Sequence, residues 1–123
     1  MHFTFENLKV YKASIDFNEQ IHKILETLSG KIPRSLRDQL QRASVSISLN
    51  IAEGNGRWHK AEKRQFFWIA RGSTFECVAI LDIMFRSKLI CQNLRANLYE
   101  KLVEISKMIA GLIKAVPDLQ SKV

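Results

Sequence analysis

Apolar residues return at alternating intervals of three and four along most of the chain, and this periodicity restricts the fold more than any other feature. Such spacing places the apolar residues on one face of an α-helix. The clearest stripe lies near the C-terminus and consists of Leu98, Leu102, Ile105, Ile109, Leu112 and Val116. No segment shows the strict apolar–polar alternation of a half-buried strand. The chain is therefore expected to be all-α.

Glycine and proline separate the periodic segments and predict where the helices end. Ser29 and Gly30 are suited to a left-handed C-terminal cap, and Pro33 is suited to the first turn of the next helix. Residues 54–56, which read Gly-Asn-Gly, are expected to end that second helix as an interhelical turn. The predicted helices span about residues 6–28, 33–54, 59–86 and 94–116. Short connections between helices of this length force neighbours to run antiparallel, so an up-down four-helix bundle over residues 1–123 is predicted.

The stripes also predict which residues form the core. In the first helix the predicted face is Val10, Ser14, Phe17, Ile21, Ile24 and Leu28. In the second it is Leu36, Leu40, Ala43, Ile47 and Asn50, with Val45, Leu49 and Ala52 beside them. In the third it is Phe66, Ala70, Ser73, Cys77, Ile80 and Met84, flanked by Phe67, Thr74, Val78, Leu81 and Phe85. These broad faces of the second and third helices, together with Gly72 and Ser73, exceed what one bundle core needs and predict an oligomer.

The composition is that of an ordinary globular protein, with 46% hydrophobic and 25% charged residues. The N-terminus lacks the features of a signal peptide, and no apolar run approaches the length of about 18 residues that a membrane span needs. A cytoplasmic protein without a membrane partner is therefore expected. Cys77 and Cys91 are too few for a disulfide framework and are expected to be free thiols.

Positive charge is concentrated in one third of the chain. The net charge is +7, and residues 31–72, with nine basic and three acidic side chains, contribute six of these charges. Such a concentration favours polyanions, with nucleic acid first among them. The alternatives are a solvated face that aids solubility and a surface that meets an acidic protein.

Residues 57–68 interleave basic and aromatic side chains, a mixture that can follow phosphates and stack on bases. Phe66 and Phe67 are assigned to the core, which leaves Trp58 and Trp68 for a contact with RNA or for a subunit interface. The side chains predicted to contact nucleic acid are Arg34, Arg37, Arg57, Trp58, Lys60, Lys63 and Arg64.

The sequence carries no recognisable catalytic or metal-binding motif. Di-iron bundles need two Glu-x-x-His pairs, whereas Glu19 and His22 form the single match, so neither a metal nor another cofactor is expected. Glu53 or Glu76 is expected to accept hydrogen bonds from Arg42, Arg57 or Arg71 in a network between helices that fixes their register. The alternative is that the two glutamates hold a divalent metal for phosphodiester cleavage.

Several blocks together resemble a known family. They read Arg-Ala-Ser-Val-Ser-Ile at 42–47, Asn-Ile-Ala-Glu-Gly at 50–54, and Ile-Ala-Arg-Gly-Ser at 69–73. The sequence resembles, over residues 5–110, the four-helix bundles encoded within intervening sequences of 23S ribosomal RNA genes. It departs from the family pattern at His59 and at residues 86–90, which affects local caps rather than the bundle.

The resemblance implies an antiparallel bundle that assembles as a homopentamer. A further likeness, to the accessory proteins of diversity-generating retroelements, implies a basic pentamer that binds a reverse transcriptase and nucleic acid. Neither likeness implies catalysis. The family's motif positions are Asn50, Glu53, Arg57, Ser73 and Glu76, and the resemblance leaves open whether they serve the fold, the assembly or a ligand.

The function favoured by these observations is that of a non-enzymatic, oligomeric protein that binds the backbone of RNA or DNA with little sequence selectivity. The first alternative is an adaptor ring that docks a protein partner such as a reverse transcriptase. The second is the metal-dependent nuclease that would use Glu53 and Glu76.

Overall fold

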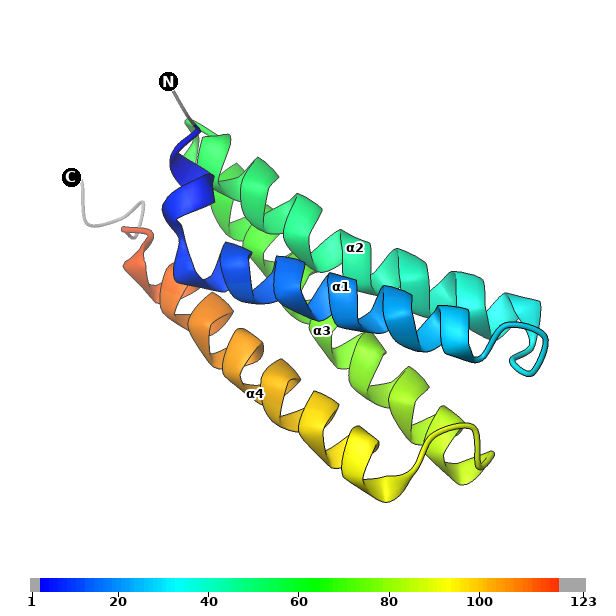
Figure 1. Ribbon diagram of the computed structural model, residues 1–123. Helices are drawn as coiled ribbons and strands as arrows, with labels where there is room; N and C mark the ends of the chain where they lie inside the picture. Colours follow the sequence, from blue (N-terminus) through cyan, green and yellow to red (C-terminus); the bar gives the residue numbers. More distant parts are fainter. Residues whose placement is uncertain (1–2, 118–123) are drawn as a thin grey trace.

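A computed structural model describes residues 3–117, which form four α-helices and one short 3-10 helix without any strand. The elements are η1 (Thr4–Asn7), α1 (Lys9–Thr27), α2 (Arg34–Gly56), α3 (Lys60–Arg86) and α4 (Gln92–Ala115). Each helix runs antiparallel to its neighbour in the sequence, so that η1 lies at the same end of the bundle as the end of α4 (Figure 1). The all-α four-helix bundle expected from the periodicity is confirmed.

The helix bounds differ from the predicted ones at two places, and each difference has a physical cause. The first helix begins at Lys9 rather than near residue 6, because η1 occupies the preceding residues and Leu8 is extended, with ψ 127°. The second helix does not end at residue 54, since Gly54, Asn55 and Gly56 are all helical, and the turn consists of residues 57–59 instead. The expectation that the Gly-Asn-Gly segment forms the turn was therefore wrong.

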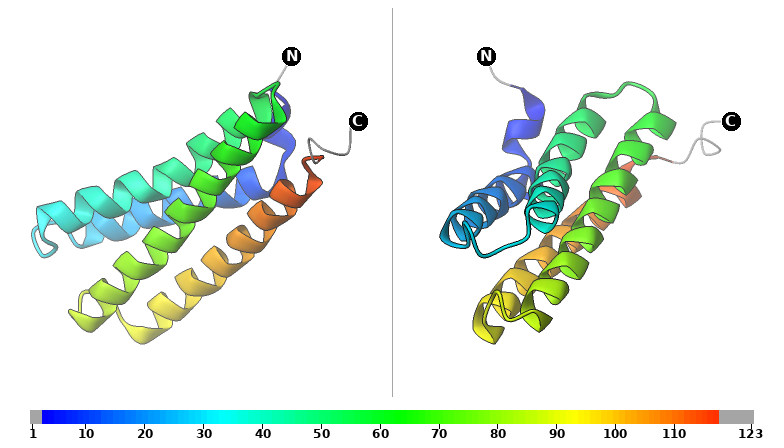
Figure 2. Two further views of the ribbon diagram at one scale, coloured as in Figure 1. Left: turned by 180° about the vertical axis from the view of Figure 1, so that it is seen from behind. Right: turned by 90° about the vertical axis from the view of Figure 1, so that its right-hand side faces the viewer.

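The four helices bury one continuous core, whose largest fully buried side chains include Phe17, Leu40, Leu81 and Leu102. Figure 2 shows the α1–α2 pair and the α3–α4 pair from two further sides, with their turns apart at the end of the bundle opposite η1. Within residues 3–117, no helix combines the length and the apolar composition that a membrane span requires.

The core differs from the predicted stripes in all four helices, although in α4 the difference is confined to Leu112, which is half-buried. In α1, Leu25 is buried where Ile24 and Leu28 were expected, and the latter two are half-buried. In α2, Val45 and Leu49 are exposed, and the second buried row consists of Ser44, Ser48 and Ile51 instead. In α3, Phe67 is buried and Phe66 is half-buried. These differences arise because spacing identifies a helical face without fixing how far that face is rotated toward each neighbour.

Small hydroxyl side chains join α1 to α2 in the core. Ser48 donates a hydrogen bond to Ser14 (2.8 Å between the two Oγ atoms), and Asn18 Nδ2 donates to Ser48 Oγ at 2.8 Å. Ser14 donates in turn to the carbonyl of Tyr11 at 2.7 Å. Because buried polar atoms are costly unless they are bonded, this chain of hydrogen bonds opposes any slip of α1 along α2.

Both cysteines are free thiols, as expected. Cys77 is fully buried in α3, and burial, with a smaller contribution from Glu76, raises the pKa of its thiol to about 12. Cys77 therefore stays neutral at physiological pH and acts as a small apolar core residue. Cys91 is exposed before the first turn of α4.

The close approach of α2 and α3 depends on the absence of a side chain at Gly54. A Cβ atom built at this position would lie 2.7 Å from Cε1 and 2.8 Å from Cδ1 of Phe67, and 3.1 Å from Cβ of Phe66. Because the Phe67 ring is buried in the core, it cannot move aside without disturbing its neighbours. Gly54 is thus needed for close packing rather than for a special backbone angle.

We predict that Gly54→Ala lowers the free energy of unfolding by about 1–3 kcal/mol through overpacking against Phe67. The matched control is Gly56→Ala, where no atom lies within 4 Å of the added Cβ. That variant is expected to leave stability unchanged or to raise it by up to about 1 kcal/mol, since alanine favours the helix. Urea denaturation at one fixed protein concentration measures both variants, and an equal effect of the two would contradict the packing argument.

Candidate nucleic-acid interface

The structure divides the predicted nucleic-acid-binding residues between two ends of the bundle. Arg34 and Arg37 lie in the first turn of α2, whereas Arg57 follows its last residue. With 23 residues in α2 and a rise of about 1.5 Å per residue, the two sites are about 35 Å apart. The remaining predicted side chains, Trp58, Lys60, Lys63 and Arg64, lie at the Arg57 end. The basic segment therefore does not form one compact surface.

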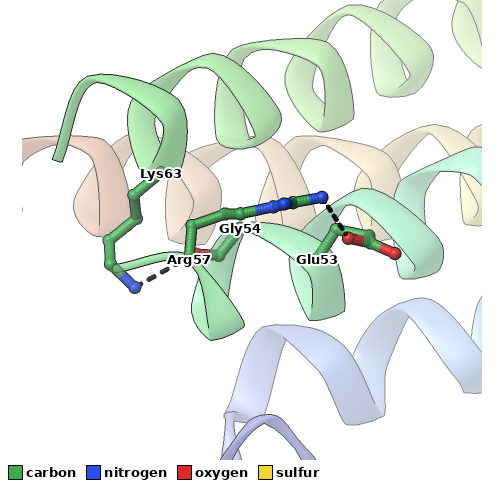
Figure 3. A network of polar contacts seen from close by, with 4 residues as sticks. All are labelled: Glu53, Gly54, Arg57 and Lys63. Carbon is green, nitrogen blue, oxygen red and sulfur yellow. Dashed lines mark hydrogen bonds and ion pairs between the residues drawn. The ribbon is translucent and has the colours of Figure 1, made fainter. Parts of the chain in front are cut away.

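At the α2–α3 turn, Arg57 is held by two neighbours. Its Nη2 donates to Glu53 Oε2 at 2.8 Å (Figure 3), and its Cζ lies 4.6 Å from the centre of the Phe66 ring. Phe66 thus contacts the guanidinium group. Phe66 and Phe67 were both assigned to the core, but Phe67 is buried there and Phe66 is half-buried. The expected contact between Glu53 and Arg57 is present, but it joins residues at the end of one helix and does not link two helices.

Lys63 and Arg64 stabilise the ends of two helices. Lys63 Nζ donates to the carbonyl of Gly54 at 3.0 Å (Figure 3) and to that of Asn55 at 2.8 Å, both at the end of α2. Arg64 Nη2 donates to the carbonyl of Val116 at 2.8 Å, directly after α4. A cation is favourable beside the free carbonyls at a helix C-terminus, and burial lowers the pKa of Lys63. Lys63 and Arg64 therefore stabilise the fold by donating to carbonyls at helix ends.

Other predicted residues stay open to solvent. Trp58 exposes 91% of its surface in the turn between α2 and α3. At the opposite end, Arg34 and Arg37 line a polar depression of about 460 Å³ together with Asp38 and Gln41. Both ends of α2 thus keep side chains that can meet a ligand.

Two of the motif residues join α2 to α3 through Ser46. The Oγ atoms of Ser46 and Ser73 are 2.8 Å apart, and Asn50 Nδ2 donates to the carbonyl (2.8 Å) and to the hydroxyl (3.0 Å) of Ser46. We call Ser46, Asn50 and Ser73 the α2–α3 seam. The Glu53–Arg57 pair lies further along α2, with Arg57 against Phe66 of α3. The contacts of these four motif residues are thus contacts within the fold.

Glu76, the fifth motif residue, is exposed and lies 3.5 Å from Nε2 of Gln39. The expected interhelical network of Glu53 and Glu76 with arginines does not form among the described residues: Glu53 pairs with Arg57 alone, and no ion pair of Glu76 is present there. Because Gln39 and Glu53 are fourteen residues apart on α2, the two carboxylates lie about 20 Å from each other. They cannot hold one metal ion, and in residues 3–117 no three His, Cys, Asp or Glu side chains cluster as metal ligands do.

Arg71, which the sequence suggested only as a partner of Glu53 or Glu76, lies between two aromatic rings instead. The Cζ atom of Arg71 lies 4.5 Å from the ring centre of Phe75 and 5.4 Å from that of Trp68. The two aromatic residues stand three before and four after Arg71 in α3, so this spacing was a visible signal for a shared helical face. Trp68 and Phe75 are each 52% exposed.

Comparison with protein-family models matches residues 6–111 to the 23S rRNA-intervening sequence protein family. The chain belongs to this family. A solved structure with the same fold is the 1.70 Å crystal structure of a protein with unknown function from the S23 ribosomal protein family of Bacteroides thetaiotaomicron VPI-5482. The match has a TM-score of 0.82 and 23% sequence identity, and it covers 86% of this chain and 96% of that chain. No curated protein sequence is significantly similar to this one.

We predict that Lys63→Met lowers the free energy of unfolding by about 1–2 kcal/mol, because two carbonyls at the end of α2 lose their donor. The matched control is Lys12→Met on the exposed side of α1, where a change below about 0.5 kcal/mol is expected. Thermal and urea denaturation of the three proteins at one concentration provide the comparison. Equal stability of the Lys63 variant and the wild type would show that the cap is unimportant.

Proposed function

We propose that this family member is a non-enzymatic, oligomeric nucleic-acid-binding protein that contacts the phosphate backbone of RNA or DNA with little sequence selectivity. The observation that carries the proposal is the placement of basic side chains at both ends of α2, about 35 Å apart. A small anion reaches only one of these ends. A nucleic acid of about ten nucleotides or base pairs is long enough to reach both.

The basic side chains at the ends of α2 support low selectivity for the nucleic-acid sequence. Arg34, Arg37 and Arg57 are cations near helix ends, and surface cations of this type mostly contact phosphate oxygens rather than base edges. Phosphate contacts fix the position of a protein on a nucleic acid without reading its sequence. The net charge of +7 adds a long-range attraction to any polyanion.

Exposed apolar side chains on the outer side of α2 and α3 support self-association. Leu49 is 59% exposed and Ile69 is 44% exposed, and they lie on the two helices that the α2–α3 seam joins. Val45, which is 40% exposed, lies one turn from Leu49 on α2. Val45 and Leu49 line one depression of the surface, and exposed apolar side chains that lie close together are typical of subunit contacts. An oligomer, with the homopentamer of similar bundles as the expected size, would repeat the basic ends and raise affinity through multivalent contact.

We predict that fluorescence anisotropy detects binding to structured RNA, duplex DNA and single strands at about 50 mM salt, with affinity falling by a log–log slope of several units up to about 300 mM. Replacing Arg34 and Arg37 together by Gln is expected to reduce that slope by about two, since two phosphate contacts are lost. The matched control replaces Lys12 and Lys23 of α1 by Gln, removes the same charge, and is expected to change the slope less.

Absence of binding at the lowest salt concentration would contradict the proposal. The basic ends would then be assigned to an acidic protein surface, and the adaptor ring that docks a protein partner would become the better explanation. A slope that falls equally in both double variants would show that net charge, rather than the end of α2, decides binding.

For the assembly, we predict a mass by light scattering that is a multiple of 14.2 kDa at micromolar concentration. Leu49→Asp combined with Ile69→Asp is expected to yield monomers, because two charges would be buried in the contact without partners. The control, Ala96→Asp on the exposed side of α4, is expected to keep the wild-type mass. A wild-type mass of one chain would exclude self-association.

A further inference from the structure

Helices α3 and α4 form an open groove on the side of α3 that is turned away from the α2–α3 seam. The groove has a volume of about 400 Å³, and its lining includes Phe75, Val78, Tyr99, Val103, Ser106 and Lys107. We call this surface the α3–α4 groove. Phe75 is 52% exposed and Tyr99 is 43% exposed, so both rings present part of their surface to solvent. Neither ring is needed to fill the core, which is formed by residues nearer the bundle axis.

A guanidinium group stands beside these rings. Arg71 lies one turn before Phe75 and contacts the rings of Phe75 and Trp68, at 4.5 and 5.4 Å from their centres. Within residues 3–117, no carboxylate lies within ion-pair distance of Arg71. The rings therefore fix the guanidinium plane, and its N–H groups remain available to an anion.

The second cation of the groove is Lys107 on α4, one turn from Val103 and beside the hydroxyl of Ser106. Arg95, by contrast, is bound to Asp82, with Nε and Nη2 at 2.9 and 2.6 Å from Oδ1. Its Cζ lies 5.2 Å from the centre of the Tyr99 ring. Arg95 therefore supports the ring of Tyr99, while Lys107 in the lining and Arg71 beside Phe75 provide the positive charge at the groove.

We propose that the α3–α4 groove binds unpaired bases of single-stranded nucleic acid, with Phe75 and Tyr99 stacking on bases and Arg71 and Lys107 contacting the adjacent phosphates. This inference rests on the proposed function and adds a site and a substrate class to it. Aromatic faces next to cations are the combination that single-strand-binding surfaces use. In a duplex the bases are stacked on each other and cannot reach these rings. The groove is therefore expected to bind unpaired strands more tightly than duplexes.

The site is distinct from the surfaces described above. The seam joins α2 to α3 and Leu49 lies on α2, whereas the groove lies between α3 and α4, and neither Leu49 nor Ile69 is part of its lining. The basic ends of α2 are not part of its lining either. A single-stranded segment in the groove and a phosphate contact at the ends of α2 are therefore compatible in one complex.

The test compares binding of a fluorescent oligothymidine and of a fluorescent blunt duplex DNA by anisotropy. Phe75→Leu combined with Tyr99→Leu keeps apolar side chains but removes both rings. It is expected to weaken oligothymidine binding by about 10-fold or more and to leave duplex binding within about twofold. Arg71→Gln is expected to weaken oligothymidine binding and to lower its salt slope by about one. The control Phe3→Leu makes the same change at an exposed ring outside the groove and is expected to have no effect.

The outcomes separate the two proposals. If the wild type binds both probes and the double variant binds oligothymidine normally, with a wild-type melting curve by circular dichroism, the groove is not the site and the proposed function stands. If the wild type binds neither probe, both proposals fail. If poly-glutamate displaces oligothymidine as well as unlabelled oligothymidine does, and the ring variants do not matter, the groove responds to charge alone and the base-stacking inference is overturned.

Discussion

The close contact of α2 with α3 determines how the rest of the molecule is arranged. Gly54 allows the ring of Phe67 to approach the backbone of α2, and the hydroxyls of Ser46 and Ser73 meet at 2.8 Å further along the same interface. Because this interface uses one side of α3, the opposite side is left for α4 and for solvent. The aromatic residues around Arg71 lie on that other side, so the packing constraint also decides which residues are open to a ligand.

The packing of the helix ends also explains why fewer basic side chains are without a partner than the number of basic residues in the sequence suggests. The end of α2 and the end of α4 both leave carbonyls without helical partners, and Lys63 and Arg64 donate to them. Arg57 is paired with Glu53 and lies on Phe66. Three cations at the C-terminal end of α2 thus have partners within the fold. The proposal for nucleic acid therefore depends most on Arg34 and Arg37 at the start of α2 and on the α3–α4 groove.

The periodicity of apolar residues was sufficient to predict four helices, their order and most of the core, because helices in a bundle must bury one continuous stripe. It was insufficient for Val45, Leu49 and the choice between Phe66 and Phe67, since these residues stand at the margins of a stripe. The partners of Lys63 and Arg64 could not be predicted, because each depends on a carbonyl of another helix. Arg71 was recognisable by its spacing from Trp68 and Phe75, but the absence of an ion pair between Arg71 and any carboxylate of residues 3–117 is a property of the folded surface.

The central claim is a division of roles in α3, whose side toward α2 holds the fold while its side toward α4 binds unpaired bases. The most direct measurement is photo-crosslinking of the protein to single-stranded nucleic acid that carries a photoreactive base, followed by mapping of the crosslinked peptides by mass spectrometry. Our account predicts crosslinks to Phe75 and Tyr99 and none to the α2–α3 seam. Crosslinks confined to the seam, or to the outer side of α2 around Leu49, would contradict it.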